Sequence, residues 1–131
     1  MILSGKSRKL LSLCSLSAVL TLFMIALYYI HLVNLEETPL EKMRYTATVY
    51  TSAIAFFTLS LSMNLVALAA YKEPKFSLLM WISTITAFIA YIFPCERLIR
   101  FNYVEALYQT VLIAVIHIVL LGLSAILSRK S

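Results

Sequence analysis

The chain has 131 residues, of which 62% are hydrophobic and 13% are charged, and its mean hydropathy is +0.92. Soluble domains are nearer half apolar, so this composition excludes an ordinary soluble domain. The formal net charge of +5 does not indicate a nucleic-acid-binding protein, because the basic residues are few and flank apolar runs instead of forming a basic patch. The runs without Asp, Glu, Lys or Arg are residues 10–33, 46–71, 76–95 and 106–128.

Each run is long enough to cross a bilayer, since about 20 apolar residues span the hydrocarbon core as a helix. Backbone groups in lipid must be satisfied internally, which leaves helices or a closed barrel. The alternating ten-residue segments of barrel strands are absent from the sequence. The sequence therefore predicts an all-α fold, an integral membrane four-transmembrane-helix bundle that forms a single domain over residues 1–131.

The basic residues favour one side of the membrane. Four spans place the regions before the first run, between the second and third, and after the fourth on the same side. The Lys/Arg excess there predicts that both termini are cytoplasmic. That side has Lys6, Arg8, Lys9, Lys72, Lys75, Arg129 and Lys130, and the other has Lys42, Arg44, Arg97 and Arg100 among Glu36, Glu37, Glu41, Glu96 and Glu105.

The second helix has a readable start and two polar faces. Thr38-Pro39-Leu40-Glu41 has the pattern of a capping box, which predicts a helix from Pro39 to Tyr71. Asn64 lies off the main stripe of small residues, so we expect this helix to contact neighbours on two sides. Small residues let helices approach closely in lipid, and the stripe comprises Ala47, Thr51, Ala55, Thr58 and Ser62.

The third helix follows a tight turn at residues 72–75, which predicts an antiparallel hairpin with the second. Its own small stripe is Ser83, Ala87 and Ala90. Pro94 is expected to end it, because proline has no N–H for the helix and clashes with the preceding turn.

The charged stretch after Pro94 is then expected to form an outer turn. We interpret Glu96, Arg97, Arg100 and Tyr103 as candidate residues for an exposed contact or for fixing that turn. The alternative is a solvated loop with an internal Glu96–Arg100 pair.

The fourth helix has one polar face and an aliphatic remainder, so the polar face should contact protein. Asn64 and His117 are the candidate interhelical polar contacts. His117 could also titrate or bind a metal, although a lone histidine on such a face is more often structural. The face comprises Tyr103, Thr110, Ala114, His117, Leu121 and Ser124.

The two cysteines are expected on opposite sides of the bilayer. Cys14 lies near the start of the first run and Cys95 at the end of the third, so they cannot pair in this topology. Both are interpreted as small buried hydrophobic residues, and acylation of Cys14 is left as an alternative.

No catalytic, cofactor-binding or metal-ligating constellation is identified, and the chain is predicted not to be an enzyme. The charged stretch carries one alternative, a glutathione-using membrane enzyme. Glu96-Arg97, Asn102 and Glu105 are similar to a signature of the four-helix membrane glutathione transferases and leukotriene-forming enzymes. Here the asparagine and the second glutamate come about two residues early, and the motif precedes the fourth helix, whereas in that family it belongs to the second.

Several short features follow one another along the chain. They are the entry from Ser7 to Cys14, the acidic loop from Asn34 to Met43, Ser77-Leu78, Glu96-Arg97, Tyr103 and the basic Arg129-Lys130. This order resembles the transmembrane protein 107 family, which has four helices and belongs to the ciliary transition zone. In the second and fourth helices, where family members carry an acidic residue, this chain offers Asn64 and His117.

The resemblance implies a non-enzymatic membrane scaffold of the Meckel–Gruber syndrome module, without a cofactor. It would recruit or retain other transition-zone membrane proteins, maintain ciliary membrane composition and support cilium assembly. The implied location is the ciliary membrane at the transition zone, with homo- or hetero-oligomers left open. The alternative is a small membrane transporter or channel subunit, for which Asn64 and His117 are the deep polar candidates.

Overall fold

A computed structural model of the chain describes residues 5–36, 39–70 and 73–129. Within these ranges the chain forms four helices and no strand, which confirms the predicted all-α fold. All four are long and apolar enough to cross a membrane, so the chain is a multi-pass membrane protein. The helices are α1 (Gly5–Val33), α2 (Leu40–Ala69), α3 (Lys75–Arg100) and α4 (Val104–Arg129).

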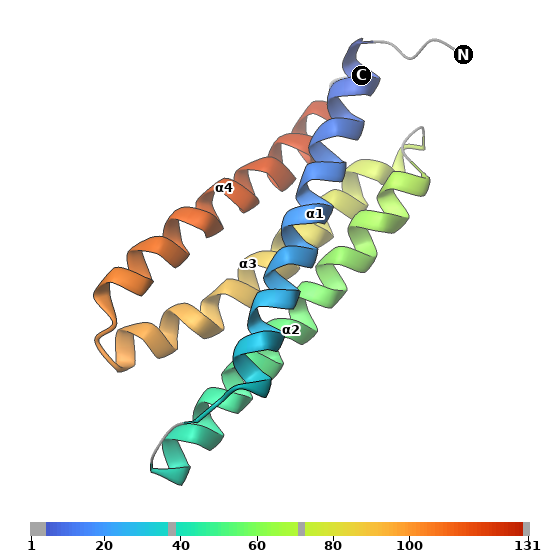
Figure 1. Cartoon of the computed structure of the whole chain (residues 1–131). Helices are drawn as coiled ribbons and strands as arrows, with labels where there is room; N and C mark the ends of the chain where they lie inside the picture. Colours follow the sequence, from blue (N-terminus) through green and yellow to red (C-terminus); the bar gives the residue numbers. More distant parts are fainter. Residues whose placement is uncertain (1–4, 37–38, 71–72, 130–131) are drawn as a thin grey trace.

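The helices run alternately up and down, with both chain ends at one end of the bundle (Figure 1). We call this the proximal end, and the opposite end, which holds the α1–α2 connection and the α3–α4 turn, the distal end. Helix α3 packs on α2 and α4, and α1 packs on the same two helices. In Figure 1 the distal ends of α1 and α4 lie well apart.

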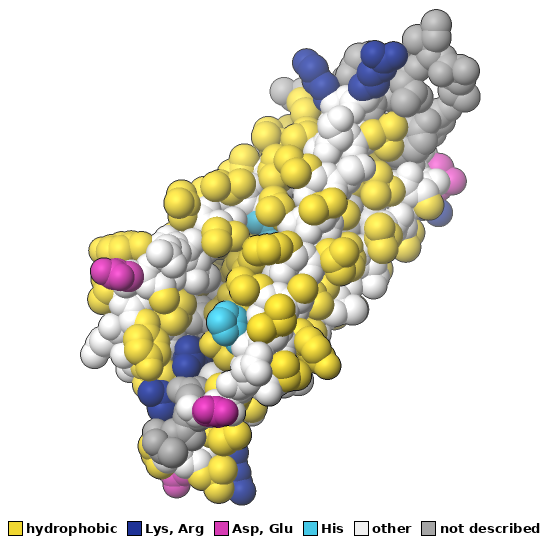
Figure 2. Space-filling view, in the orientation of Figure 1, with side chains coloured by type: hydrophobic (Ala, Val, Ile, Leu, Met, Phe, Trp, Pro, Cys, Tyr) yellow, Lys and Arg dark blue, Asp and Glu magenta, His cyan; other side chains and the backbone are white. Residues whose placement is uncertain are grey.

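The core has two apolar clusters, one nearer each end. The proximal cluster includes Leu10, Phe76 and Leu121, and the distal cluster includes Met24 and Phe57. The outer surface is also mostly apolar, as the yellow side chains in Figure 2 show. An apolar exterior around a packed core is what a bilayer requires of a helix bundle.

Helix α3 does not end at Pro94, so that prediction was wrong. The helix continues for six residues to Arg100. Proline is tolerated inside a transmembrane helix when neighbouring groups satisfy the backbone that it disrupts. The structure also shows Pro94 buried in the bundle.

Asn102, two residues past the last residue of α3, terminates the helix and has a φ of 60°. Its N–H donates to the carbonyl of Ile99 at 3.2 Å, and the N–H of Tyr103 donates to the carbonyl of Leu98 at 2.9 Å. These two bonds form a Schellman motif, in which a residue in the left-handed region closes the helix. Asparagine is one of the few residues besides glycine that adopt this conformation readily.

Helix α2 begins at Leu40, with Pro39 at the N-cap position and no side-chain cap. The predicted cap residue, Thr38, and the predicted last residue, Tyr71, lie outside the described residues. The helix has 30 residues and is therefore about 45 Å long. All four helices extend beyond their uncharged runs, because Lys, Arg and Glu near a helix end can reach water while the backbone stays helical.

Candidate functional site

The charged distal end ties α2 to α3 and to the α3–α4 turn. Arg100 Nη2 lies 2.9 Å from Glu96 Oε1, one turn away on the same exposed face. The Tyr45 hydroxyl, from the start of α2, also donates to Glu96. Lys42 Nζ donates to the Tyr103 hydroxyl at 3.2 Å and lies 4.7 Å from the Phe101 ring centroid. The structure therefore places Glu96, Arg100 and Tyr103 together at the helix ends.

Arg97 points inward, which corrects the expectation that it is exposed. Its exposed fraction is 7%, and its Nε donates to Thr46 Oγ1 of α2 at 2.9 Å. Its guanidinium carbon lies 5.4 Å from the Tyr50 ring centroid and 5.6 Å from that of Tyr103. Arg97 continues the buried face of α3 past Pro94. This buried position was not expected, because the sequence predicts that the helix ends at Pro94.

His117 lies fully buried at the centre of a polar layer that joins three helices. Its Nε2 is 2.8 Å from Thr21 Oγ1 of α1, and its Nδ1 is 2.8 Å from the Tyr91 hydroxyl of α3. The Phe57 ring of α2 stacks on the imidazole with a centroid distance of 6.3 Å.

The hydrogen-bond network assigns the tautomer of His117. Thr21 Oγ1 donates its proton to the Ser17 carbonyl at 2.8 Å, so it accepts from Nε2–H of His117. The other nitrogen, Nδ1, then accepts from the Tyr91 hydroxyl. Every member is satisfied with a neutral imidazole. In the described part of the chain, no three His, Cys, Asp or Glu residues come together in a way that could hold a metal ion.

Asn64 forms a second polar contact, in the proximal half of the bundle. Its Oδ1 accepts from Cys14 Sγ of α1 at 2.8 Å, and Cys14 Sγ lies 3.6 Å from Met80 Sδ of α3. Asn64 Nδ2 is buried and has no hydrogen-bond partner among the described residues. Cys14 and Cys95 are both free thiols, as predicted. Cys14 has no exposed surface, so an acylating enzyme cannot reach it in this conformation.

The small stripe of α3 packs on α2 through a reciprocal pair of serines. Ser60 Oγ donates to the Ser83 carbonyl at 2.8 Å, and Ser83 Oγ donates to the Ser60 carbonyl at the same distance. Ala87 and Ala90, further along the stripe, are fully buried.

Helix α2 contacts neighbours on two sides, α1 and α3, as predicted, but most of its stripe of small residues faces outward. Thr51, Ala55, Thr58 and Ser62 are all exposed. The hydroxyls of Thr58 and Ser62 donate to carbonyls one turn earlier in α2, at 2.8 and 2.9 Å. We call these four residues the α2 outer stripe.

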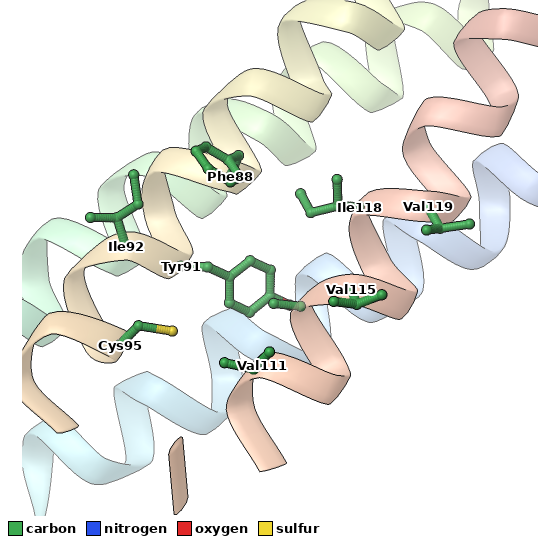
Figure 3. A pocket seen from close by; sticks show the side chains of 9 residues that line it. Phe88, Tyr91, Ile92, Cys95, Val111, Val115, Ile118 and Val119 are labelled. Atoms are coloured by element: carbon green, nitrogen blue, oxygen red, sulfur yellow. The ribbon is translucent and has the colours of Figure 1, made fainter. Parts of the chain in front are cut away.

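An apolar groove of about 340 Å³ lies between α3 and α4 in their distal halves. Figure 3 shows Tyr91 and Cys95 of α3 on one side and Val111 and Val115 of α4 on the other. None of the described residues that line the groove is charged, so the groove offers an apolar surface without a charged contact.

Comparison of the chain with protein-family models, curated proteins and solved structures finds no match in any of the three.

Proposed function

We propose that this protein is a non-enzymatic scaffold that binds other membrane proteins within the bilayer. The observation that supports this proposal most directly is the exposure of the α2 outer stripe. The other stripe of small residues, on α3, is buried in the bundle. Helix association in lipid depends on close packing between small side chains, because no hydrophobic driving force acts between helices there. A stripe of this kind is the surface that a partner helix would pack on.

The polar interior supports a structural role for the bundle itself. His117 has both ring nitrogens bonded to neighbouring helices, and Ser60 and Ser83 satisfy each other. These contacts hold the four helices together and leave the outer faces available for partners.

The proposal also places the protein at the ciliary transition zone, which the family resemblance supports. It places the basic proximal end in the cytoplasm, which the charge bias supports. Imaging a tagged copy in ciliated cells tests the location. We expect a band at the ciliary base. Uniform signal in the plasma membrane or the endoplasmic reticulum, with no such band, would contradict the location.

The partner-binding surface has its own test. Ala55→Leu adds a bulky side chain to the α2 outer stripe and should reduce recovery of co-purifying membrane proteins after cross-linking in cells. Ala26→Leu is the matched control, since Ala26 is also exposed but lies on α1 among the exposed Leu22, Phe23 and Ile30. Equal recovery from both variants would remove the α2 outer stripe as the binding surface.

A further inference from the structure

The apolar groove between α3 and α4 adjoins a second hollow, of about 480 Å³, that carries charge at the distal end. Ile92 and Cys95 line both hollows. Residues 88–100 of α3, which include every residue that this helix contributes to the two linings, rise about 18 Å. The two hollows therefore form one amphipathic surface, with a long apolar part and a short polar end. The other residues of the second hollow are Glu96, Ile99 and Arg100.

The walls of the apolar part are stiff. The Tyr91 ring lies between α3 and α4 (Figure 3), and its hydroxyl is held by the 2.8 Å bond to His117 Nδ1. Most of the other lining residues are β-branched, and such side chains have essentially one χ1 rotamer on a helix. Fixed walls favour a rigid occupant, because a flexible acyl chain loses torsional freedom when it is confined. The β-branched residues are Ile92, Val111, Val115, Ile118 and Val119.

The rim of the groove does not suit a partner helix. Phe88, Ile92, Val111 and Val115 are all large and exposed, whereas helix association in lipid favours small side chains at the contact. The apolar part of the surface therefore favours a lipid over a membrane-spanning segment of another protein.

The polar end is an exposed ion pair without net charge. Arg100 Nη2 lies 2.9 Å from Glu96 Oε1, and the two side chains are 59% and 47% exposed, so each has surface left for a further hydrogen bond. The carboxylate repels an anionic group at this position and the guanidinium repels a cationic one. A neutral hydroxyl can accept from the guanidinium and donate to the carboxylate. The ion pair therefore fits an uncharged lipid with a hydroxyl head.

We propose that the surface between α3 and α4 binds a membrane sterol. The sterol hydroxyl lies at Glu96 and Arg100, the fused rings lie along Tyr91 and Val111, and the tail extends toward Val119. A sterol is flat, rigid and uncharged and has one hydroxyl at one end, which are the properties that the two parts of the surface select. Both volumes are within the range of small-molecule sites. This site is separate from the α2 outer stripe, so it goes beyond the scaffold function proposed above.

The test measures equilibrium binding of tritiated cholesterol to the purified full-length protein in detergent micelles. Two unlabelled competitors probe the two parts of the site in the wild-type protein. Cholestane has the same rings and tail without the hydroxyl, so it should compete about fivefold less well than cholesterol, because a hydrogen bond to a charged group is lost. Phosphatidylcholine at the same concentration should not displace the sterol, because its acyl chains are flexible.

Substitutions at matched positions test the two parts separately. Val111→Trp places an indole in the groove and should weaken cholesterol binding by roughly tenfold or more. Leu112→Trp is its control, since Leu112 is the next residue of α4, is exposed and does not line the groove. Arg100→Leu should narrow the difference between cholesterol and cholestane. Arg44→Leu, at an exposed arginine of α2 that lines neither hollow, should leave that difference unchanged.

The competitor measurements need no variant, so the proposal stays testable if Val111→Trp does not fold. Equal competition by cholestane and cholesterol, displacement of the sterol by phosphatidylcholine, or an equal loss of binding in Val111→Trp and Leu112→Trp would each overturn the proposal.

Discussion

Replacing His117 with leucine should destabilise the bundle by about 2 kcal/mol. The change removes two interhelical hydrogen bonds, each 2.8 Å long, and such bonds contribute about 0.6 kcal/mol on average in membrane proteins. It also leaves the buried Tyr91 hydroxyl without a partner, which costs roughly 1 kcal/mol more. Thr21 keeps its bond to the Ser17 carbonyl, so no unpaired hydroxyl on α1 adds to this loss of stability.

The assay is reversible unfolding in mixed micelles, with the free energy of unfolding measured for His117→Leu, Tyr91→Phe and the double variant. In the Tyr91→Phe background, His117→Leu neither leaves a hydroxyl unpaired nor removes the Tyr91–His117 bond, so the loss of stability in the double variant should be smaller than the sum of the two single losses by about 1.6 kcal/mol. Val115→Leu, at an exposed position of α4, should be near neutral. A loss below about 0.5 kcal/mol for His117→Leu, or strictly additive effects, would refute the assignment of this network.

Three further substitutions separate the structural roles of other residues. Asn64→Leu should raise the free energy of unfolding by about 1 kcal/mol, because it removes a buried Nδ2 that has no partner among the described residues. A lower free energy of unfolding in the same micelle assay would show that the amide is satisfied. Asn102→Ala should lower stability by about 1 kcal/mol, because the residue has a φ of 60°, whereas Asn102→Gly should not. Equal melting temperatures for the two variants would contradict the Schellman motif at the end of α3. Ser83→Ala should cost about 1 kcal/mol through its bonds to Ser60, whereas Ser62→Ala, whose hydroxyl bonds only within α2, should leave the unfolding transition unchanged.

The four helices could be predicted because length and hydropathy alone decide whether a segment can cross a bilayer. The proximal part of the inward face of α4 could also be predicted, since His117, Leu121 and Ser124 recur at helical spacing and all three are buried. Tyr103 was predicted on the same face, but it precedes α4 and is exposed. The partners of His117 could not be predicted, because Thr21 and Tyr91 come from two other helices and only packing brings them together.

The inward face of α2 was ambiguous for a physical reason. Both faces carry small or polar side chains, with Ser60 and Asn64 on one and Thr51 and Thr58 on the other. Composition does not decide which of two such faces is buried, and in the structure it is the face with Ser60 and Asn64. The buried position of Arg97 could not be predicted for a different reason. Proline usually breaks a helix in water, whereas a buried transmembrane helix can continue through a proline.

The lengths of the helices bear on which membrane suits this protein. The uncharged parts of the four helices, residues 10–33, 46–69, 76–95 and 106–128, have 20 to 24 residues, which correspond to about 30 to 36 Å. The average hydrocarbon core is only about 30 Å thick, and the reticulum is thinner than the plasma membrane by several Å. Each ångström of mismatch costs a fraction of a kcal/mol, and four joined helices share the same mismatch. A moderate tilt of the bundle absorbs a mismatch of this size, so helix length alone does not select a thicker membrane.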